Sequence, residues 1–467
     1  MPQERREQAI HVEMTGESPT SRYDALLEKN RRHLWNPFTQ MRGFLESSPP
    51  VITRGEGVRL FDSEGRGYFD GNSSLWVNIH GHGRPELNEA LVAQAGRVAH
   101  STLLGMSNEP AIELSERLAA IAPGALSKVF FSDSGAAAVE IGLKIAFAYW
   151  RRVGRPEKRR FVAFENGYHG DTVGAMSVGG IDVFQAEFAP LLFDVERVGF
   201  PASYRLDTTP EEAGKQSIRA LEALFDRLGG EVACIVIEPL IQGAGGMVTM
   251  PSGFLTEVVR LAHAHEVLVL ADEVATGFGR TGAMFACDTE GVAPDLMTVG
   301  KGLTGGYLPV AATLATDEIY AAFLGEYAEL KALFHGHSFT GNQLGCAVAL
   351  ASLDLFERDD LLATSRASAE QLATGMKAIA DMAHVGDVRQ CGLMIGIELV
   401  SDRESHEPFD WRERMGFQVC ERARELGMLT RPLSDVVVFM PPLSSTPKEL
   451  REMVGILEHS IVDVTDR

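Results

Sequence analysis

Four short apolar runs in the middle of the chain constrain its fold more than any other feature. They read KVFFSD (128–133), RFVAFEN (160–166), ACIVIEP (233–239) and VLVLADEV (267–274), and helix-like stretches separate them. Runs that are apolar nearly throughout are typical of strands buried on both faces, and strands that alternate with helices form parallel sheets. The sequence therefore predicts an α/β fold with a mostly parallel sheet covered by helices.

The same pattern suggests how the chain is divided. A helix is expected to begin at Ser134, directly after a strand, because serine is a good N-cap and apolar residues then recur every three or four positions. A long apolar helix is expected around 340–356. We expect an N-terminal segment (1–75) that contributes to a small domain, a large domain (76–338) and a C-terminal small α/β domain (339–467).

Composition excludes several classes of partner. Of the 467 residues, 43 are lysine or arginine and 64 are aspartate or glutamate, so the net charge is −21. This acidic excess argues against a nucleic acid or an anionic membrane as partner. No stretch is apolar for the length of a membrane span, and the five cysteines are never spaced as Cys-x-x-Cys. We expect a cytoplasmic protein with reduced cysteines and a loosely held start of about twenty residues.

Two patterns resemble known motifs but predict neither a dinucleotide site nor a metal site. The run 277–282 matches the dinucleotide fingerprint G-x-G-x-x-G, but Asp272, Glu273 and three further residues separate it from the strand, and 283–295 does not resemble the required helix. Three histidine pairs have an i,i+2 spacing on expected loops and match no zinc-ligand pattern, so no metal site is expected. These pairs are His80/His82, His263/His265 and His335/His337.

Four other features fit together as one site. Asp272 ends a strand, where ligands bind in parallel sheets. Ser134 and Gly135 begin a helix whose free amides suit a phosphate. Tyr168 lies on a glycine-flanked turn and can cover a planar ligand, and Lys301 is an amine held between two glycines. Each feature alone has an ordinary alternative: a salt bridge, an N-cap, a structural tyrosine or a surface lysine. Together they supply what a pyridoxal phosphate site needs.

Longer segments carry a family resemblance, from about residue 30 to the C-terminus. They resemble the class III aminotransferases, which are fold type I pyridoxal phosphate enzymes, and the resemblance implies a mostly parallel seven-stranded sheet, a smaller α/β domain and a homodimer. The matching segments are HLWNPFTQM, FFSDSGAAAVEIGLKIAFAYW, FENGYHGDTVGAMSV, IEPLIQGAGGM, VLVLADEVATGFGRTGAMFACDTEGVAPDLMTVGKGLTGGYLP, HGHSFTGNQLGCAVA and GMLTRPLSDVVVFMPPL.

The resemblance implies a role for each residue of the predicted site. Lys301 would form a Schiff base with pyridoxal phosphate and then move the proton between the donor carbon and the cofactor. Asp272 would pair with the ring nitrogen and keep it protonated. Tyr168 would stack on the ring and shape the substrate pocket, and Ser134 and Gly135 would bind the phosphate.

The resemblance adds residues that no local pattern singled out. Glu238 and Gln242 would support the site on the side of the ring's oxygen. Gly336, His337 and Ser338 would reach into the neighbouring subunit of a homodimer, where they would complete the phosphate cup and the substrate pocket.

The substrate follows from the same resemblance. Arg431 would hold a substrate carboxylate, and Phe38 and Trp76 would line an apolar channel. The segments most resemble the branch that aminates 8-amino-7-oxononanoate to 7,8-diaminononanoate in biotin biosynthesis, by a ping-pong mechanism. An ω-amino acid:pyruvate aminotransferase is the alternative, because it shares the cofactor residues. Phe38 replaces a tyrosine of well-known members and Leu75 a tryptophan, so the donor stays open between lysine, slightly favoured, and S-adenosylmethionine.

Overall fold

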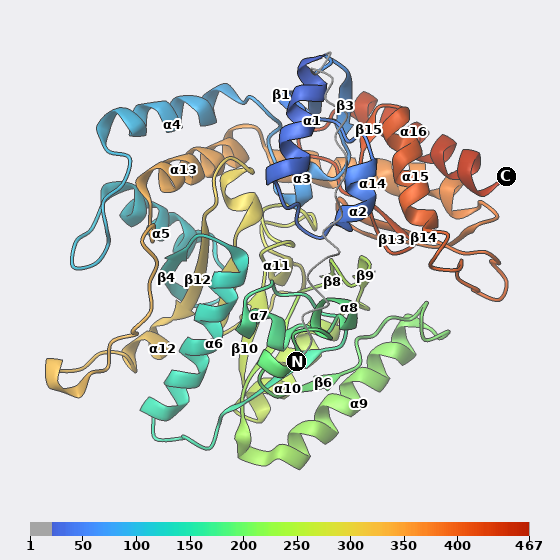
Figure 1. The fold of residues 1–467 in the computed structure, drawn as a ribbon. Coiled ribbons are helices and arrows are strands. Elements are labelled where there is room, and N and C mark those ends of the chain that lie inside the picture. The colour runs from blue at the N-terminus through green and yellow to red at the C-terminus, as the bar shows by residue number, and fades with distance from the viewer. Residues whose placement is uncertain (1–20, 467) are drawn as a thin grey trace, which may run out of the picture. The chain divides into compact units, whose positions relative to one another are not determined.

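The computed structural model describes residues 21–466 (Figure 1). Contacts divide this part of the chain into two compact units. One consists of 21–55 and Leu60–Gly67, and the other of Glu56–Arg59 and the chain from Tyr68 onward. The expectation for the first twenty residues lies outside the described part. Within the described part, no helix is both long and apolar enough to cross a membrane.

The helices and strands alternate along most of the chain. The helices are α1 (Arg22–His33), α2 (Met41–Glu46), α3 (Ser73–Trp76), α4 (Pro85–Arg97), α5 (Glu109–Ile121), α6 (Gly135–Arg152), α7 (Val173–Val178), α8 (Asp182–Gln185), α9 (Pro210–Leu228), α10 (Phe254–Ala264), α11 (Ala286–Glu290), α12 (Asp317–Ala321), α13 (Gln343–Arg358), α14 (Leu361–Ala380), α15 (Met415–Glu425) and α16 (Pro447–Thr465), with the 3-10 turns η2 (Ala189–Leu191), η3 (Gly229–Glu231), η4 (Lys301–Thr304) and η5 (Tyr327–Glu329). The strands are β1 (Ile52–Glu56), β2 (Arg59–Asp62), β3 (Gly67–Asp70), β4 (Leu126–Ser132), β5 (Arg160–Phe164), β6 (Val195–Val198), β7 (Val232–Ile237), β8 (Ile241–Gln242), β9 (Val248–Thr249), β10 (Leu268–Asp272), β11 (Leu296–Val299), β12 (Ala311–Thr316), β13 (Val385–Cys391), β14 (Met394–Leu399), β15 (Met428–Leu429), β16 (Arg431–Leu433) and β17 (Val436–Phe439).

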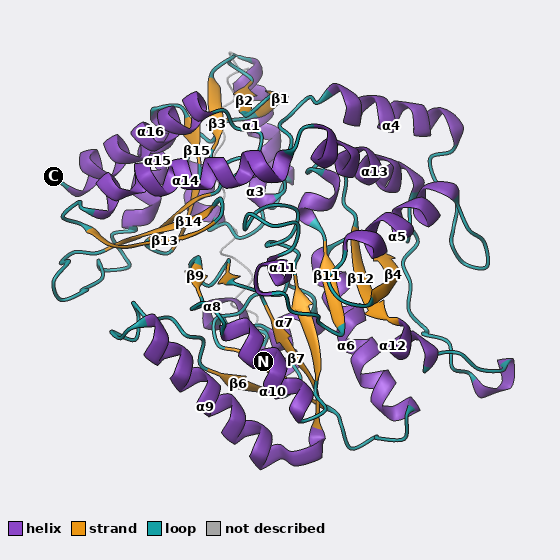
Figure 2. Cartoon of the chain, turned by 180° about the vertical axis from the view of Figure 1, so that it is seen from behind, coloured by secondary structure: helices purple, strands orange, loops and turns teal. Residues whose placement is uncertain are grey.

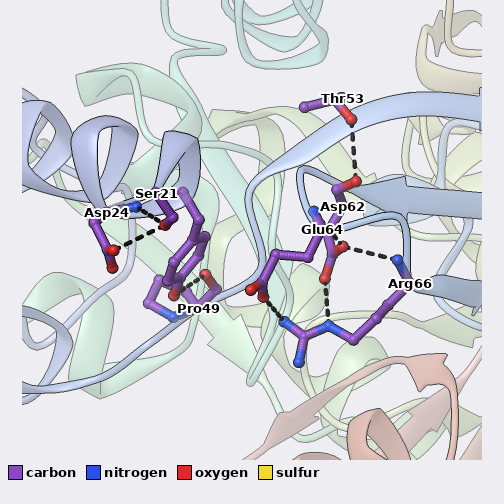
Figure 3. Close-up of polar contacts among 8 residues, drawn as sticks. Ser21, Asp24, Pro49, Thr53, Asp62, Glu64 and Arg66 are labelled. Carbon is purple, nitrogen blue, oxygen red and sulfur yellow. Dashed lines mark hydrogen bonds and ion pairs between the residues drawn. The ribbon is translucent and has the colours of Figure 1, made fainter. Parts of the chain in front are cut away.

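The smaller unit is organised by local polar contacts (Figure 3). Ser21 caps α1 because its hydroxyl oxygen accepts a hydrogen bond from the Asp24 amide at 3.1 Å. The buried carboxylate of Asp62 accepts bonds from the amides of Glu64, at 3.0 Å, and Arg66, at 2.9 Å. Arg66 Nε adds an ion pair to the same carboxylate at 2.8 Å. Asp62 therefore holds the turn that follows β2.

The central sheet of the larger unit contains seven strands in the order β4-β12-β11-β10-β7-β5-β6. β12 is antiparallel to both of its neighbours, and the strands from β11 to β6 are parallel. The four apolar runs form β4, β5, β7 and β10, and the long apolar helix expected around 340–356 is α13. The predicted α/β fold with a mostly parallel sheet is confirmed.

Helices cover both faces of this sheet, which explains why its strands are apolar throughout. Alternate residues of a strand join different core clusters: Val162 of β5 packs in one cluster with Phe225 of α9, and Ala163 packs in the other with Ile141 of α6. Neighbouring positions therefore both need apolar side chains.

A second sheet lies near the end of the chain, with strand order β13-β14-β17-β16 and antiparallel pairing throughout. Helices α14 and α15 pack on it, and α16 packs on both of these helices. Figures 1 and 2 show these helices gathered beside β13 and β14. β16 carries Arg431. β15, which directly precedes β16 in the chain, belongs to another sheet, where it pairs in parallel with β3 (Met428 opposite Phe69).

The segment after the G-x-G-x-x-G match differs in part from expectation. It does contain a helix, but α11 has only five residues and follows the turn rather than opening from its glycines. Gly279 has φ +83°, and a Cβ there would lie 2.6 Å from a methyl group of Leu443. Arg280, in the middle of the match, is fully buried. These residues serve a tightly packed turn.

The close approach of α6 to β10 yields a stability prediction. Gly142 faces Leu270, and a Cβ at position 142 would lie 2.9 Å from a Leu270 methyl group. Gly142→Val should therefore lower the free energy of unfolding by about 1–3 kcal/mol, since overpacking forces the helix away from the strand. Gly96→Val in α4 is the matched control, because nothing lies within 4 Å of its Cβ position. Chemical denaturation that shows equal effects of the two substitutions would contradict this packing.

Candidate active site

A cavity of about 440 Å³ opens where β10 ends. Its wall brings together residues from distant parts of the chain, including most of those predicted from local patterns. Among them are Trp76, Gly135, Tyr168, Glu238, Asp272 and Lys301.

Asp272, the last residue of β10, is only 4% exposed and is held by three partners. Its Oδ2 lies 2.7 Å from Nδ1 of the buried His169, and its Oδ1 accepts bonds from Thr298 Oγ1 at 3.0 Å and the Val274 amide at 3.1 Å. The carboxylate therefore has a fixed orientation. His169 and Thr298 were not among the predicted site residues. His169 could have been found because it adjoins Tyr168, whereas Thr298 lies opposite Asp272 only through the register of β11.

Burial shifts the acid–base behaviour of this end of the cavity. Burial alone disfavours a charged His169, but the hydrogen bond and the charge of Asp272 outweigh it and raise the pKa of His169. Burial also raises the pKa of Glu238 to about 7, against the opposing effects of His169 and of the Tyr168 amide, which donates to Glu238 Oε1 at 2.9 Å. The same end of the cavity therefore holds the ion pair of His169 with Asp272 and the carboxyl group of Glu238, whose pKa is about 7.

Lys301 follows β11 and lies at the cavity wall. Its backbone has φ +38°, in the left-handed region, which is uncommon for a residue with a side chain. Its ammonium lies 5.1 Å from the centre of the Trp76 ring. Burial lowers the pKa of Lys301, while Asp272 and Glu238 favour the charged form. A lowered pKa leaves more of the amine deprotonated and nucleophilic.

The N-terminus of α6 forms another part of the wall. Ser134 is the N-cap, and its hydroxyl oxygen accepts a bond from the Ala137 amide at 3.2 Å. Gly135 and Ala136 line the cavity, so the free amides and the positive end of the helix dipole suit an anion there. A Cβ at position 135 would lie 2.6 Å from Val274, and therefore only glycine fits.

Tyr168 contributes an aromatic wall with a fixed hydroxyl. The hydroxyl donates to Asp171 Oδ2 at 2.7 Å, and burial together with this bond raises the pKa of Tyr168 well above its ordinary value. The charge of Arg431 acts on Tyr168 in the opposite direction. Arg431 is thus electrostatically coupled to the site, although it does not line the cavity itself.

Trp76 reaches the wall from an unusual turn that the sequence did not reveal. Ser73, Ser74, Leu75 and Trp76 have φ values of 46°, 49°, 69° and 71°. Element α3 is therefore a left-handed turn built entirely from residues other than glycine, at a cost of about 1–2 kcal/mol per residue.

Other predicted residues lie elsewhere. Gly336, His337 and Ser338 precede α13 and do not line this cavity. Gln242 lies on β8, where its side-chain amide donates to the Glu165 carbonyl at 2.9 Å. Phe38 belongs to the smaller unit. The roles assigned to these residues stay predictions.

The wall fits pyridoxal phosphate in its chemistry. It offers a buried carboxylate for a ring nitrogen, helix amides for a phosphate, an aromatic side chain for the ring and an amine for the aldehyde. Among residues 21–466, no group of three or more histidine, cysteine, aspartate or glutamate side chains could hold a metal ion.

Comparison with known proteins identifies the family. The model of the family described as "Aminotransferase class-III" matches residues 45–461. The chain belongs to the class III aminotransferases. A curated relative from Geobacter sulfurreducens, named adenosylmethionine-8-amino-7-oxononanoate aminotransferase, is 54% identical over 443 residues, which are 94% of this chain and 98% of the relative. A relative with the same name from Anoxybacillus flavithermus is 52% identical over 94% of this chain and 97% of its own length.

Solved structures of class III aminotransferases share the fold. The crystal structure of adenosylmethionine-8-amino-7-oxononanoate aminotransferase from Methanocaldococcus jannaschii superposes with a TM-score of 0.90 at 42% identity, covering 94% of this chain and 99% of that one. The omega transaminase from Pseudomonas jessenii in complex with PMP gives a TM-score of 0.91 at 33% identity, covering 94% and 98%. The chain is therefore an aminotransferase with the fold of this family.

The ion pair of His169 and Asp272 predicts a pH dependence of stability. Because the folded pKa of His169 is raised, the stability that its charge contributes is fully present below its ordinary pKa of 6.5 and is lost as the pH rises through the folded value. His169→Asn keeps a hydrogen-bond donor but no charge. In the cofactor-free protein it should lower the free energy of unfolding by about 2 kcal/mol at low pH.

The difference in the free energy of unfolding between parent and variant should shrink as the pH rises through the folded pKa of His169. Denaturant titrations at a series of pH values measure it, with His459→Asn as control, since His459 is exposed on α16. A difference that grows with pH would show that His169 is neutral in the folded protein.

Proposed function

We propose that this class III aminotransferase uses pyridoxal phosphate to aminate 8-amino-7-oxononanoate to 7,8-diaminononanoate, a step of biotin biosynthesis. The observation that carries the proposal is the set of groups in the cavity, in a chain that is 54% identical over 94% of its length to a relative named for that acceptor. The omega transaminase of known structure superposes equally well but is only 33% identical, so the pyruvate-dependent alternative is less well supported.

Each cofactor contact is assigned to a residue already placed at or beside the cavity. Asp272, fixed by His169, would hold a proton on the ring nitrogen. The amides at Gly135 and Ala136, in the turn capped by Ser134, would bind the phosphate, and Tyr168 would stack on the ring. The cofactor supplies an acceptor for the electron pair released when a proton leaves the donor carbon.

Lys301 is the group that moves this proton. A lowered pKa would let Nζ accept the proton from the amine-bearing carbon of the donor and pass it to the cofactor carbon that takes up the amine. The Trp76 ring lies beside Nζ, with its centre 5.1 Å away. Glu238 supports the site from the other side, with a pKa of about 7.

The substrate contacts lie toward Arg431. We assign its guanidinium to a substrate carboxylate because it is charged, half-buried and electrostatically coupled to Tyr168. Trp76 and Phe38 are assigned to the aliphatic chain of the substrate. The names of the relatives favour S-adenosylmethionine as donor, whereas Phe38 and Leu75 favour lysine, so the donor must be found by experiment.

A homodimer would complete the site. Gly336, His337 and Ser338 are assigned to the cavity of a partner subunit. They do not line the cavity of their own subunit, which is consistent with this assignment. Their segment also exposes large apolar side chains, which is typical of a surface covered by another subunit. These side chains include Tyr327, Leu330, Phe334 and Phe339.

We place the enzyme in the cytoplasm. The cysteines at 234, 287, 346, 391 and 420 are all free, as expected in a reducing compartment. The division into a segment 1–75, a large domain 76–338 and a small domain 339–467 is retained as the proposed domain arrangement.

Single-turnover kinetics test the proposed function. The holoenzyme is first aminated in a scan of donors that includes S-adenosylmethionine, lysine and alanine, and is then mixed with 8-amino-7-oxononanoate or with pyruvate. We expect one of the first two donors to load the enzyme and 8-amino-7-oxononanoate to yield 7,8-diaminononanoate, detected by mass spectrometry. An aminated enzyme that reacts readily with pyruvate and ignores 8-amino-7-oxononanoate would overturn the assignment.

A further inference from the structure

The left-handed turn α3 needs an external support. It has the hydrogen bonds of a helical turn, from the Trp76 amide to the Asn72 carbonyl and from the Val77 amide to the Ser73 carbonyl, both at 2.9 Å. Its four residues all carry side chains, which clash with the backbone in this conformation. A turn of this kind persists only where surrounding contacts hold it.

Asp70 provides the largest group of such contacts. Its carboxylate is 1% exposed and accepts four hydrogen bonds. Oδ1 accepts from the Ser74 amide at 2.7 Å, and Oδ2 lies 2.8 Å from Ser74 Oγ, 2.9 Å from His82 Nε2 and 3.3 Å from Asn78 Nδ2. Although burial opposes ionisation, the bonds from His82 and Ser74 lower the pKa of Asp70. One carboxylate thus ties the middle of the turn to the chain that follows it.

Two further side chains, those of Ser73 and Arg280, hold the turn and the chain just after it. Ser73 Oγ donates to the Met440 carbonyl at 2.7 Å. The buried guanidinium of Arg280 donates to the Asn78 carbonyl at 2.6 Å and to the Pro441 carbonyl at 2.8 Å. Asp70 differs from these anchors because it alone bonds the backbone amide of a residue inside the turn, Ser74.

The turn sets the place of the Trp76 ring. The ring is 5% exposed, its indole N–H donates to Asn72 Oδ1 at 2.9 Å, and its centre lies 5.1 Å from Lys301 Nζ. On its edge it meets Gly243, where a Cβ would lie 3.0 Å from the ring. The Gly243 amide donates to Glu238 at 2.9 Å. Trp76 therefore fills the space between the reactive amine and the backbone that holds Glu238.

We propose that Asp70 is a positioning residue for amine transfer: its carboxylate holds α3 in the left-handed conformation, and this conformation keeps the Trp76 ring against Lys301 Nζ. The inference rests on the proposed function of Lys301. When Asp70 cannot hold the turn, its residues relax to right-handed or extended conformations, and Trp76 leaves the wall beside the amine.

Asp70→Asn tests this role, because asparagine keeps the shape but loses the charge and one acceptor oxygen. In the holoenzyme we expect faster hydrogen exchange of the Trp76 and Val77 amides, which the turn protects. We also expect the single-turnover rate constant for amination by the donor to fall by about 10- to 100-fold, the effect of misplacing a group beside the reacting atoms. Asp62→Asn is the matched control, since Asp62 is another buried aspartate that holds a turn, in its case by accepting bonds from two backbone amides.

A second substitution separates positioning from general stability. Leu75 has φ +69° and is 46% exposed, and glycine adopts this conformation without strain. Adding Leu75→Gly to Asp70→Asn should therefore restore protection of the amides and recover about tenfold in rate. Ser74→Ala removes a single bond to Asp70 and should show the same changes more weakly, which keeps the test decisive if Asp70→Asn does not fold.

Parent-like exchange and rate in Asp70→Asn would overturn the inference, as would lost protection without a change in rate. Failure of glycine at position 75 to restore either quantity would also overturn it. The exchange measurement does not depend on the substrate. A parent enzyme that does not aminate 8-amino-7-oxononanoate would contradict the proposed function alone.

Discussion

The ion pair between His169 and Asp272 is the interaction on which the rest of the site depends. A carboxylate that is 4% exposed is costly to ionise unless it is paired, and His169 at 2.7 Å supplies the opposite charge. Thr298 and the Val274 amide donate hydrogen bonds to the other oxygen, so the carboxylate is fixed in orientation. The seven-stranded sheet makes this possible because adjacent parallel strands end at the same edge.

Buried charged groups near Lys301 shift its pKa, because the low dielectric of their surroundings strengthens electrostatic interactions. Asp272 and Glu238 favour its ammonium form, whereas burial and the buried Arg280 favour the neutral amine. The balance lowers the pKa of Lys301, which suits the proton transfer that we propose for this residue. Trp76, at the end of its left-handed turn, lies beside this amine. Fixed charged groups thus surround the amine to which we assign the proton transfer.

The sequence predicted those parts of the molecule that depend on local pattern. Apolar runs marked the buried strands, a strand end marked Asp272, and two flanking glycines marked Lys301. The partnership of Thr298 with Asp272 depends on register between strands and leaves no local signal. The left-handed turn at Ser73–Trp76 was invisible because it contains no glycine, the usual sign of positive φ. The roles of Phe38 and His337 stay predictions, since one belongs to the smaller unit and the other is assigned to a partner subunit.

We propose that Lys301 is the amine that joins pyridoxal phosphate beside Asp272. Borohydride reduction of the holoenzyme, followed by digestion and peptide mapping by mass spectrometry, tests it directly. We expect a phosphopyridoxyl group on the peptide that contains Lys301. Lys158 is an internal comparison, because burial lowers its pKa as well, but its ammonium donates to the Glu266 carbonyl at 2.7 Å. A label on Lys158 or another lysine, with Lys301 unmodified, would contradict this role of Lys301.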